Sequence, residues 1–335
     1  MSPTATAPTR TGIHVRRLAR EDLDAVVAVD AAILGRTRRA YFERRLAAAL
    51  RQPEVHVQFA IEENGVFRGH LLARVLEGEF GRTKPALRLE VVSVSPDAHS
   101  HGLGRALHAA LEKEAAGRGV NDLRTASTWR DHGMLRFLAA MGYSLAPAMV
   151  LECSVQAARH AERPVESQQH GGDPNDYSMS PANDFEQMPR DTIDVRLLTL
   201  KDLDAVVRID RNYTGRERAE YMRHALDETL RDSAIRVSLA GRVEGQMAGF
   251  IMARADLGDF GRAEPVAIID TLGVDPGYHG KGVGHALLSQ IFVNLAALHI
   301  ERVETVVAHE HAELMAFFRG AGFAQGQRLA FHKTL

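Results

Sequence analysis

Residues 274–288 read VDPGYHGKGVGHALL, and residues 94–108 read VSPDAHSHGLGRALH. Each stretch begins at the end of an apolar run, passes through a glycine-rich turn and continues with apolar residues at helical spacing. Glycine-rich turns that open a helix usually bind phosphate, because backbone N–H groups and the positive end of the helix dipole meet there. The two stretches therefore predict one phosphate-binding loop that occurs twice in the chain.

The rest of the chain repeats together with these loops. IHVRRLAREDLDAVVAVD, which begins at residue 13, aligns with IDVRLLTLKDLDAVVRID, which begins at residue 193, and the alignment runs on without a gap. Roughly 40 of about 143 aligned positions are identical, far more than chance gives for an ungapped alignment. We therefore predict two homologous domains, at residues 13–155 and 193–335.

The segments outside the repeats differ in composition. Residues 1–12 (MSPTATAPTRTG) lack the apolar core of a secretion signal and are expected to form a disordered tail. Residues 156–192 are rich in Pro, Gly, Ser, Asn, Asp and Gln, which is typical of a flexible linker.

Composition narrows the class of protein. Of the 335 residues, 45% are hydrophobic and 25% are charged, which is enough to fill ordinary globular cores. The formal net charge of −2 gives no indication of nucleic-acid binding, and the absence of an apolar run near 18 residues gives none of a membrane span. Cys153 is the only cysteine, so no internal disulfide can form, and we expect a small core residue in a cytoplasmic protein.

The order of elements is the same in both repeats. A short strand and a helix (Leu23, Val26 and Val27 on one face) precede a second, charged helix over about 37–51. An Asn-Gly pair at 64–65 between two strand-like runs predicts a hairpin. A long strand, the glycine loop and further strands and helices follow. Strands clustered ahead of a β–loop–α–β unit predict an α+β fold (an α/β mixed sheet), mostly antiparallel, with helices on both faces.

Two common phosphate-binding patterns do not fit the glycine loop. The dinucleotide pattern G-x-G-x-x-G would need glycine where the chain has Leu107 and Leu287. The nucleoside-triphosphate pattern G-x-x-x-x-G-K-[ST] fails because Lys281 is followed by Gly282.

The loop instead resembles the acyl-CoA loop of the GNAT superfamily of N-acyltransferases, with V-x-P followed by [basic]-x-x-G-x-G-x-A-L. The resemblance covers both repeats and implies acetyl-CoA as co-substrate, bound through backbone N–H groups that glycine leaves accessible. The coenzyme-binding positions that it implies are Val92, Val94, His99, Gly102, Leu103 and Gly104 in the first repeat, and Leu272, Val274, His279, Gly280, Lys281, Gly282, Val283 and Gly284 in the second. His99 and His279 replace the usual Arg or Gln, and Lys281 adds a cation that His101 does not match, so the second loop is the better coenzyme site.

The resemblance also implies a general base on the long strand. Glu90 and Asp270 occupy the same place in the two repeats, and the acid there often takes the amine proton in this family. The apolar flanks of the strand would raise the pKa of such a carboxyl group, which suits a base near neutrality. A carboxylate paired with an arginine is the alternative. The family's tyrosine acid is missing, because Leu138 and Phe318 stand at its position.

Two further stretches recur, GRxRxxY and G[ED]FGR. In the GNAT layout they lie on the acceptor side, so Tyr41, Tyr221, Glu79 and Asp259 are candidates for binding a cationic amine. Alternatively, their arginines form carboxylate pairs that hold a loop in place. HEHAE at 309–313 lacks the spacing of a zinc motif, so no metal site is expected.

Three functions follow from this sequence. The leading one is an acyl-CoA-dependent N-acetyltransferase that moves an acetyl group to a primary amine of a small molecule or a protein, as a monomeric pseudo-dimer or a homodimer, without nucleic acid or membrane. The alternatives are a non-catalytic acyl-CoA-binding or regulatory tandem module, and an enzyme of this fold with another acyl group or an oxygen or thiol acceptor. Tandem GNAT chains are known in which one half catalyses and the other supports it, and we expect the second half to be the catalytic one.

Overall fold

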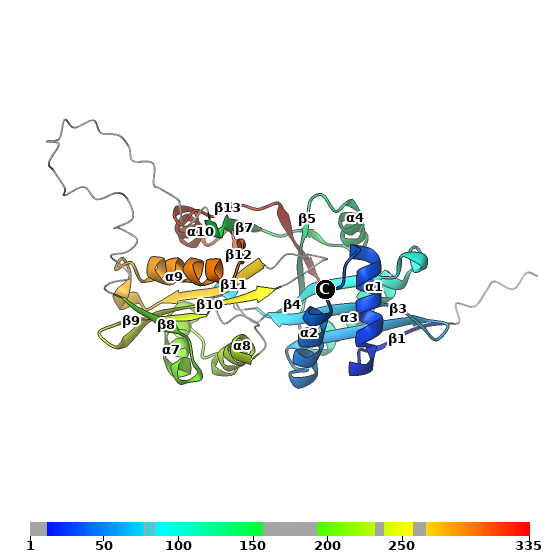
Figure 1. The fold of residues 1–335 in the computed structure, drawn as a ribbon, viewed down its shortest axis with the longest axis horizontal. Helices are drawn as coiled ribbons and strands as arrows, with labels where there is room; N and C mark the ends of the chain where they lie inside the picture. The colour runs from blue at the N-terminus through cyan, green and yellow to red at the C-terminus, as the bar shows by residue number, and fades with distance from the viewer. Residues whose placement is uncertain (1–11, 77–78, 82–83, 157–192, 232–237, 257–265) are drawn as a thin grey trace, which may run out of the picture.

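The computed structural model describes residues 12–76, 79–81, 84–156, 193–231, 238–256 and 266–335. Nearly all of the predicted tail and linker lies outside these residues, and so does Asp259. The chain forms two halves that lie side by side, each built on a seven-stranded sheet (Figure 1). The two sheets and their helices match the predicted α+β class.

The first half follows the predicted order of elements. Its helices and strands are β1 (Ile13–Arg17), α1 (Leu23–Leu34), α2 (Arg39–Arg51), β2 (His56–Glu63), β3 (Val66–Leu76), the 3-10 turn η2 (Glu79–Gly81), β4 (Ala86–Val94), α3 (Leu103–Gly117), β5 (Asp122–Thr128), α4 (His132–Ala140), β6 (Ser144–Leu145) and β7 (Ala148–Ser154).

The second half repeats this order. Its elements are β8 (Asp194–Leu197), α7 (Leu203–Thr214), α8 (Ala219–Arg231), β9 (Leu239–Val243), β10 (Gln246–Asp256), β11 (Val266–Val274), α9 (Val283–Ala297), β12 (Arg302–Ala308), α10 (Ala312–Gly320), β13 (Ala324–Gln325) and β14 (Arg328–Thr334).

The hairpin between β2 and β3 confirms the Asn-Gly prediction. Asn64 and Gly65 have φ values of 54° and 76°, and two consecutive positive φ values match a turn that follows the right-handed twist of the strands. Glu244 and Gly245 form the corresponding turn between β9 and β10, with φ values of 50° and 78°.

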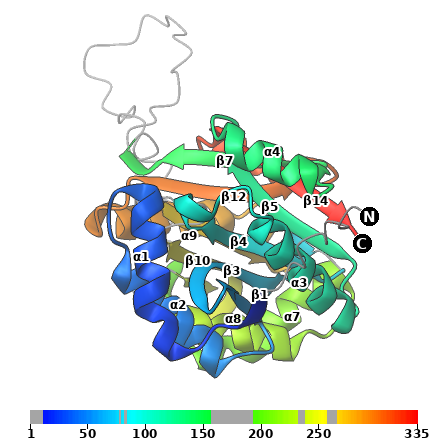
Figure 2. The same cartoon turned by 90° about the vertical axis from the view of Figure 1, so that its right-hand side faces the viewer.

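Helices cover both faces of each sheet. Successive residues of a strand point to opposite sides, so neighbouring apolar residues of one strand join different core clusters. In β3, Leu71 and Ala73 join a core cluster with α3, whereas Leu72 joins a cluster with α1 and α2. In the second half α9 and α10 cover one face and α7 and α8 the other (Figure 2 shows the first half end-on). Among the described residues, no helix is long and apolar enough to span a membrane.

The closing strand of each repeat lies in the sheet of the other half. The strand order is β1-β2-β3-β4-β5-β14-β6 in one sheet and β13-β7-β12-β11-β10-β9-β8 in the other. β7 pairs with β12 along its whole length, and β14 pairs with β5 in the same way. Lys333 on β14 donates to the carbonyl oxygen of Met141 in the first half, at 2.6 Å. The sheets therefore do not coincide with the repeats.

Cys153 on β7 is a core residue, as predicted. Its side chain is buried in the core of the second half, and burial raises the pKa of its thiol to about 11. The thiol is therefore protonated near neutral pH and is a poor nucleophile.

Candidate active site

The glycine loops are built alike in both halves. Gly102 and Gly282 stand at the N-terminal caps of α3 and α9 with φ values of 85° and 80°, a conformation that side chains disfavour. A Cβ atom on Gly104 would lie 3.1 Å from the Phe137 ring, and one on Gly284 would lie 3.1 Å from the Phe317 ring. The glycines therefore bring an aromatic ring of the late helix close to the loop, and the first N–H groups of each helix stay available to an anion.

The loop histidines are exposed and contact the end of the long strand. The Nε2 atom of His99 lies 3.0 Å from the carbonyl oxygen of Val94, and that of His279 lies 3.2 Å from the carbonyl oxygen of Val274. In the second half the Tyr213 hydroxyl also donates to the Val274 carbonyl and lies 2.6 Å from His279 Nε2. These rings hold the loop against the strand, a role different from the anion contact of the family's Arg.

The cationic position of the loop differs between the halves. His101 Nδ1 lies 3.1 Å from Glu63 Oε1, so an acidic side chain accompanies it. Lys281, its counterpart, is exposed and stacks over the Tyr278 ring at 4.8 Å, and Val243 replaces the acid. The second loop therefore offers the more positive surface to a phosphate.

The candidate coenzyme positions next to the loops contribute in different ways. Leu103 and Val283 are fully buried, so only their backbones can contact a ligand. Val92, Val94, Leu272 and Val274, on the ends of β4 and β11, are half-buried. Gly280 has a φ value of 72°, and its counterpart, Ser100, has the same left-handed backbone without being glycine.

A β-bulge sets the two candidate bases apart from their neighbours. The ladder between β3 and β4 steps from Leu72↔Val91 to Ala73↔Leu89, so Glu90 has no opposite residue. The ladder between β10 and β11 skips Asp270 in the same way. The parallel pairing with the next strand ends just before each acid, at Arg88 and at Ile268. Each acid therefore stands where two strands begin to diverge.

Two threonines that the sequence analysis did not single out bridge the start of this divergence. The Thr125 hydroxyl on β5 donates to the Leu89 carbonyl at 2.9 Å, and the Thr305 hydroxyl on β12 donates to the Ile269 carbonyl at 3.1 Å. They occupy equivalent positions in the two repeats. The conservation of threonine between the repeats was the one sequence signal that could have indicated them.

Glu90 is enclosed by arginines from both halves. Its Oε2 accepts hydrogen bonds from Arg45 Nε at 2.9 Å and Arg45 Nη2 at 2.7 Å, while Arg74 and Arg254 lie 3.9 and 3.8 Å from Oε1. Burial alone would raise the pKa of Glu90, but the three arginines outweigh it and hold the pKa well below its usual range. The expected rise in pKa is therefore wrong for Glu90, which is 2% exposed.

Asp270 has a more open environment. Arg254 Nε lies 3.0 Å from its Oδ2, and the Asp270 side chain is 27% exposed. Ala225 stands at the position of Arg45, so the close arginine of the first half has no counterpart on α8. Asp270 thus pairs with Arg254 and keeps a side that solvent or a substrate can reach.

The GRxRxxY stretch is held by a buried ion pair in both halves. Arg38 Nε donates to Asp30 at 2.9 Å, and Arg218 Nε donates to Asp210 at 2.9 Å. These two arginines therefore form the carboxylate pairs that the sequence analysis gave as the alternative to acceptor binding. Tyr41 is buried beside Arg38, with the guanidinium 5.2 Å above its ring.

Tyr221 instead contacts the other half. Its hydroxyl donates to Glu79 Oε1 at 3.3 Å. Burial, with the charges of Glu79 and Asp270, raises the pKa of Tyr221 well above its usual value, so the hydroxyl remains a donor. The structure thereby brings Glu79, Tyr221 and Asp270 into one neighbourhood, with residues from both repeats.

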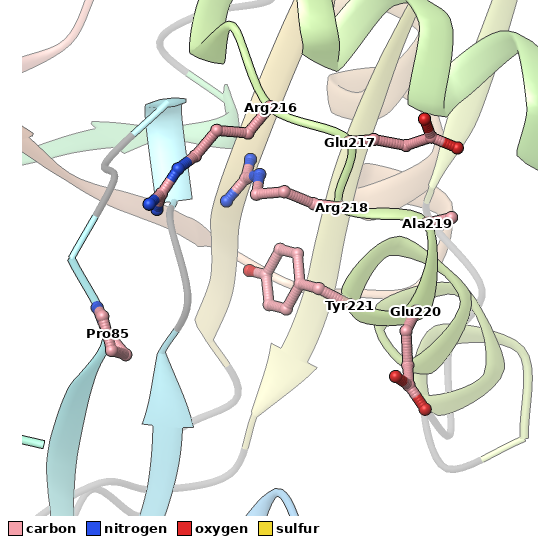
Figure 3. A pocket seen from close by; sticks show the side chains of 7 residues that line it. All are labelled: Pro85, Arg216, Glu217, Arg218, Ala219, Glu220 and Tyr221. Carbon is pink, nitrogen blue, oxygen red and sulfur yellow. The ribbon is translucent and has the colours of Figure 1, made fainter. Parts of the chain in front are cut away.

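A cavity of about 550 Å³ opens beside Tyr221. The segment leading into α8 forms most of its wall, and Pro85 of the first half closes the other side (Figure 3). Arg216, Arg218 and Tyr221 point toward Pro85, whereas Glu217 and Glu220 point away from it (Figure 3). The cavity can therefore receive a molecule between the two halves.

The position at which the family has its tyrosine holds an apolar residue in both late helices. Leu138 and Phe318, at the expected tyrosine position, are completely buried. His311 caps α10 and His309 precedes it, and among the described residues no three metal-ligating side chains gather.

Comparison with known sequences agrees with this geometry. The family described as Acetyltransferase (GNAT) matches residues 25–143 and 203–323. The mycothiol acetyltransferase of Clavibacter michiganensis subsp. michiganensis (strain NCPPB 382) is 31% identical over 248 residues, which are 71% of this chain and 69% of that protein.

Solved structures share the fold. A tandem GNAT protein from the clavulanic acid biosynthesis pathway superposes with a TM-score of 0.61 at 17% identity, covering 96% of this chain and 98% of that one. A GCN5-related N-acetyltransferase from Sphaerobacter thermophilus gives a TM-score of 0.55 at 16% identity, covering 98% and 97%. Since the family matches both repeats, each with its glycine loop and diverging strands, the chain belongs to the GNAT family of N-acetyltransferases and carries two GNAT regions in tandem.

Proposed function

We propose that the second half transfers an acetyl group from acetyl-CoA to a primary amine by direct attack, with Asp270 as general base. The observation that carries this proposal is the difference between the two acids. Glu90 is enclosed by Arg45, Arg74 and Arg254, whereas within the described part of the chain Asp270 pairs with Arg254 alone and is 27% exposed. The first half then supports the second, which explains why its acid can serve as a structural counter-ion.

The loop of the second half suits the coenzyme. Backbone N–H groups of residues 280–284 and the side chain of Lys281 would hold the pyrophosphate, because the glycines leave the backbone uncovered and the helix dipole favours an anion. The strand end at Leu272–Val274 would receive the pantetheine arm where β11 leaves β12. The coenzyme supplies an activated acetyl thioester.

Proton removal falls to Asp270. A primary ammonium group has a pKa of about 10.4, so it must lose a proton before attack. The Asp270 carboxylate can take this proton directly or through water, because its side chain lies beside Arg254 and reaches solvent. With Phe318 at the family's tyrosine position, the thiolate leaves without a protein acid, which a thiol pKa of about 8.5 allows.

The acceptor would enter the cavity between the halves. Glu79 provides a carboxylate that attracts an ammonium group, and the Tyr221 hydroxyl holds that carboxylate in place. A small-molecule amine fits the volume of about 550 Å³, and a protein amine could reach it with one side chain. The acceptor of the curated mycothiol acetyltransferase relative belongs among the amines to be tested. We expect the protein to act in the cytoplasm.

Calorimetric titration with acetyl-CoA, followed by a panel of amines, tests this function. We expect one or two equivalents of acetyl-CoA to bind and at least one amine to be acetylated by the wild type, but not by Asp270→Asn. Binding without turnover of any amine would favour the non-catalytic acyl-CoA module. Full turnover in Asp270→Asn would show that Asp270 is not the general base.

A further inference from the structure

The turn η2 of the first half packs onto the second half. Phe80, at its centre, packs against the core cluster of the second half, and η2 lies against β11 and α7. The ring of Phe80 meets Phe318 edge-on, with 5.9 Å between the centroids and 88° between the planes. An aromatic side chain of one repeat is thus part of the apolar interior of the other.

The position of Phe80 follows from its two contacts. Phe318 lies on α10, which follows β12, so Phe80 is between an element attached to β12 and the strand β11. The recorded pairing of β11 with β12 ends at Ile268↔Glu304, before Asp270. Phe80 therefore lies at the open end of the gap between these two strands.

The neighbouring residue supports this placement. Glu79 contacts Tyr221 on α8, whereas Phe80 contacts Phe318 on α10, and these two helices cover opposite faces of the sheet. Adjacent residues can reach both faces only where the sheet is open. The turn η2 thus lies across the gap, with Glu79 on the acceptor side and Phe80 on the side of α9 and α10.

The backbone at Phe80 is in the left-handed region, with φ 50° and ψ 45°. Aromatic residues rarely adopt this region, because Cβ approaches the following carbonyl oxygen. Such a conformation persists only where surrounding contacts over-determine it, and it is common where a side chain must be aimed. Here it directs the ring of Phe80 onto Phe318.

We infer that Phe80 limits the length of the acyl group that the second half accepts. The inference rests on the proposed function, in which the thioester lies between β11 and β12 near Asp270. The Phe80 ring, backed by Phe318, then forms the end wall of the acyl subsite. An acetyl group fits in front of this wall, whereas each further methylene must displace the ring or leave the gap. The first half thereby determines the donor specificity of the second.

Calorimetry on the full-length protein tests the inference, with CoA, acetyl-CoA, butyryl-CoA and hexanoyl-CoA as ligands. The variants are Phe80→Ala, which removes the wall, and Phe80→Leu, which shortens it. Phe67→Ala is the matched control, because Phe67 is a half-buried phenylalanine in a cluster of the first half away from the gap. Thermal unfolding of each variant accompanies the titrations.

We expect the wild type to bind acetyl-CoA more tightly than hexanoyl-CoA, and Phe80→Ala to change that affinity ratio by about tenfold or more in favour of the longer chain. Phe80→Leu should lie between them and Phe67→Ala should match the wild type. If both variants bind acetyl-CoA and keep the wild-type ratio of affinities for acetyl-CoA and hexanoyl-CoA, the inference is wrong although the proposed function stands. If the wild type binds no acyl-CoA, the proposed function fails and the inference with it. If Phe80→Ala does not fold, Phe80→Leu alone decides between these outcomes.

Discussion

The Tyr221 hydroxyl donates a hydrogen bond of 3.3 Å to Glu79 Oε1, and thereby joins α8 of the second half to a turn of the first. This contact makes the proposed acceptor site a product of both repeats. It also places the Glu79 carboxylate next to the hydroxyl of Tyr221, a residue that lines the cavity.

Glu79→Gln should weaken acceptor binding. Loss of the charge removes a charge-assisted interaction of about 1–2 kcal/mol, so KM for a cationic amine should rise roughly five- to thirty-fold while kcat changes little. Steady-state kinetics at saturating acetyl-CoA measure this. Glu220→Gln is the control, because Glu220 lines the cavity but its side chain points away from Pro85 and the first half (Figure 3). An unchanged KM in Glu79→Gln would exclude Glu79 from acceptor binding.

The two acids should respond differently to amidation. Asp270→Asn should lower kcat by roughly 10²–10⁴-fold with little effect on stability, as expected for loss of a general base. Glu90→Gln should instead destabilise the fold by about 3–5 kcal/mol, because it leaves Arg45 buried without its counter-charge. Single-turnover rates and urea unfolding separate the two effects.

Ala225→Arg provides a sharper version of this comparison. It places an arginine on α8 where Arg45 stands on α2 and should make Asp270 a weaker base, with a rate at least about tenfold lower. Ala116→Arg, on an exposed site of α3, controls for the added charge. A normal rate in Ala225→Arg would mean that the arginine at this position does not distinguish the halves.

Lys281→Ala should weaken coenzyme binding about two- to fivefold at low salt, which is the usual size of an exposed charge contact. The difference from the wild type should shrink as salt screens the phosphates. Titrations of acetyl-CoA at two ionic strengths measure both effects, with the exposed Lys201→Ala as control. Equal affinities at low salt would show that backbone groups alone hold the pyrophosphate.

The first half should be the acid-sensitive one. Burial, together with Arg38, lowers the pKa of His70 to about 3. Burial also lowers the pKa of His108 to about 4, where Lys333 lowers it further and Glu112 opposes the shift. Above pH ~6.5 both rings are neutral in the folded and unfolded chain, so their contribution is complete there. Below pH ~6.5 the unfolded chain takes up protons that the folded chain does not, so stability falls until the folded pKa values are reached.

Urea unfolding at pH 7.5 and pH 5.0 tests this direction. Each histidine should cost about 2 kcal/mol at pH 5.0. The double variant His70→Phe with His108→Leu should remove most of this loss, since the second repeat carries Phe250 and Leu288 at these positions. A pH dependence equal to that of the wild type would contradict the assignment.

Much of the fold could be predicted because the signals are local. The Asn-Gly turn, the apolar spacing of the helices and the glycine loop each depend on a few adjacent residues, and the ungapped repeat required that both halves share them. The positions of Glu90 and Asp270 on the long strand could also be predicted from the sequence. Their bulge follows from strand geometry that has no sequence signature.

What could not be predicted depends on contacts between distant residues. The enclosure of Glu90 needs Arg254 from 164 residues away, and nothing in the local sequence links the two. The exchange of β7 and β14 also could not be predicted, because a closing strand has the same hydrophobic pattern whichever sheet it joins. The contrast between Arg45 and Ala225 was visible in the repeat alignment, but its meaning required the ion pair.

The exchanged strands have a consequence for the history and handling of the protein. Cutting the chain between Ser154 and Asp194 would give each fragment a sheet that lacks one strand and a strand that lacks its sheet. Two copies of the first fragment could satisfy both needs by trading their β7 strands, and would form a swapped pair. The present chain then corresponds to such a pair fused into one polypeptide. In the single chain the two exchanged strands interlock the halves, so that neither sheet is complete without a strand of the other repeat.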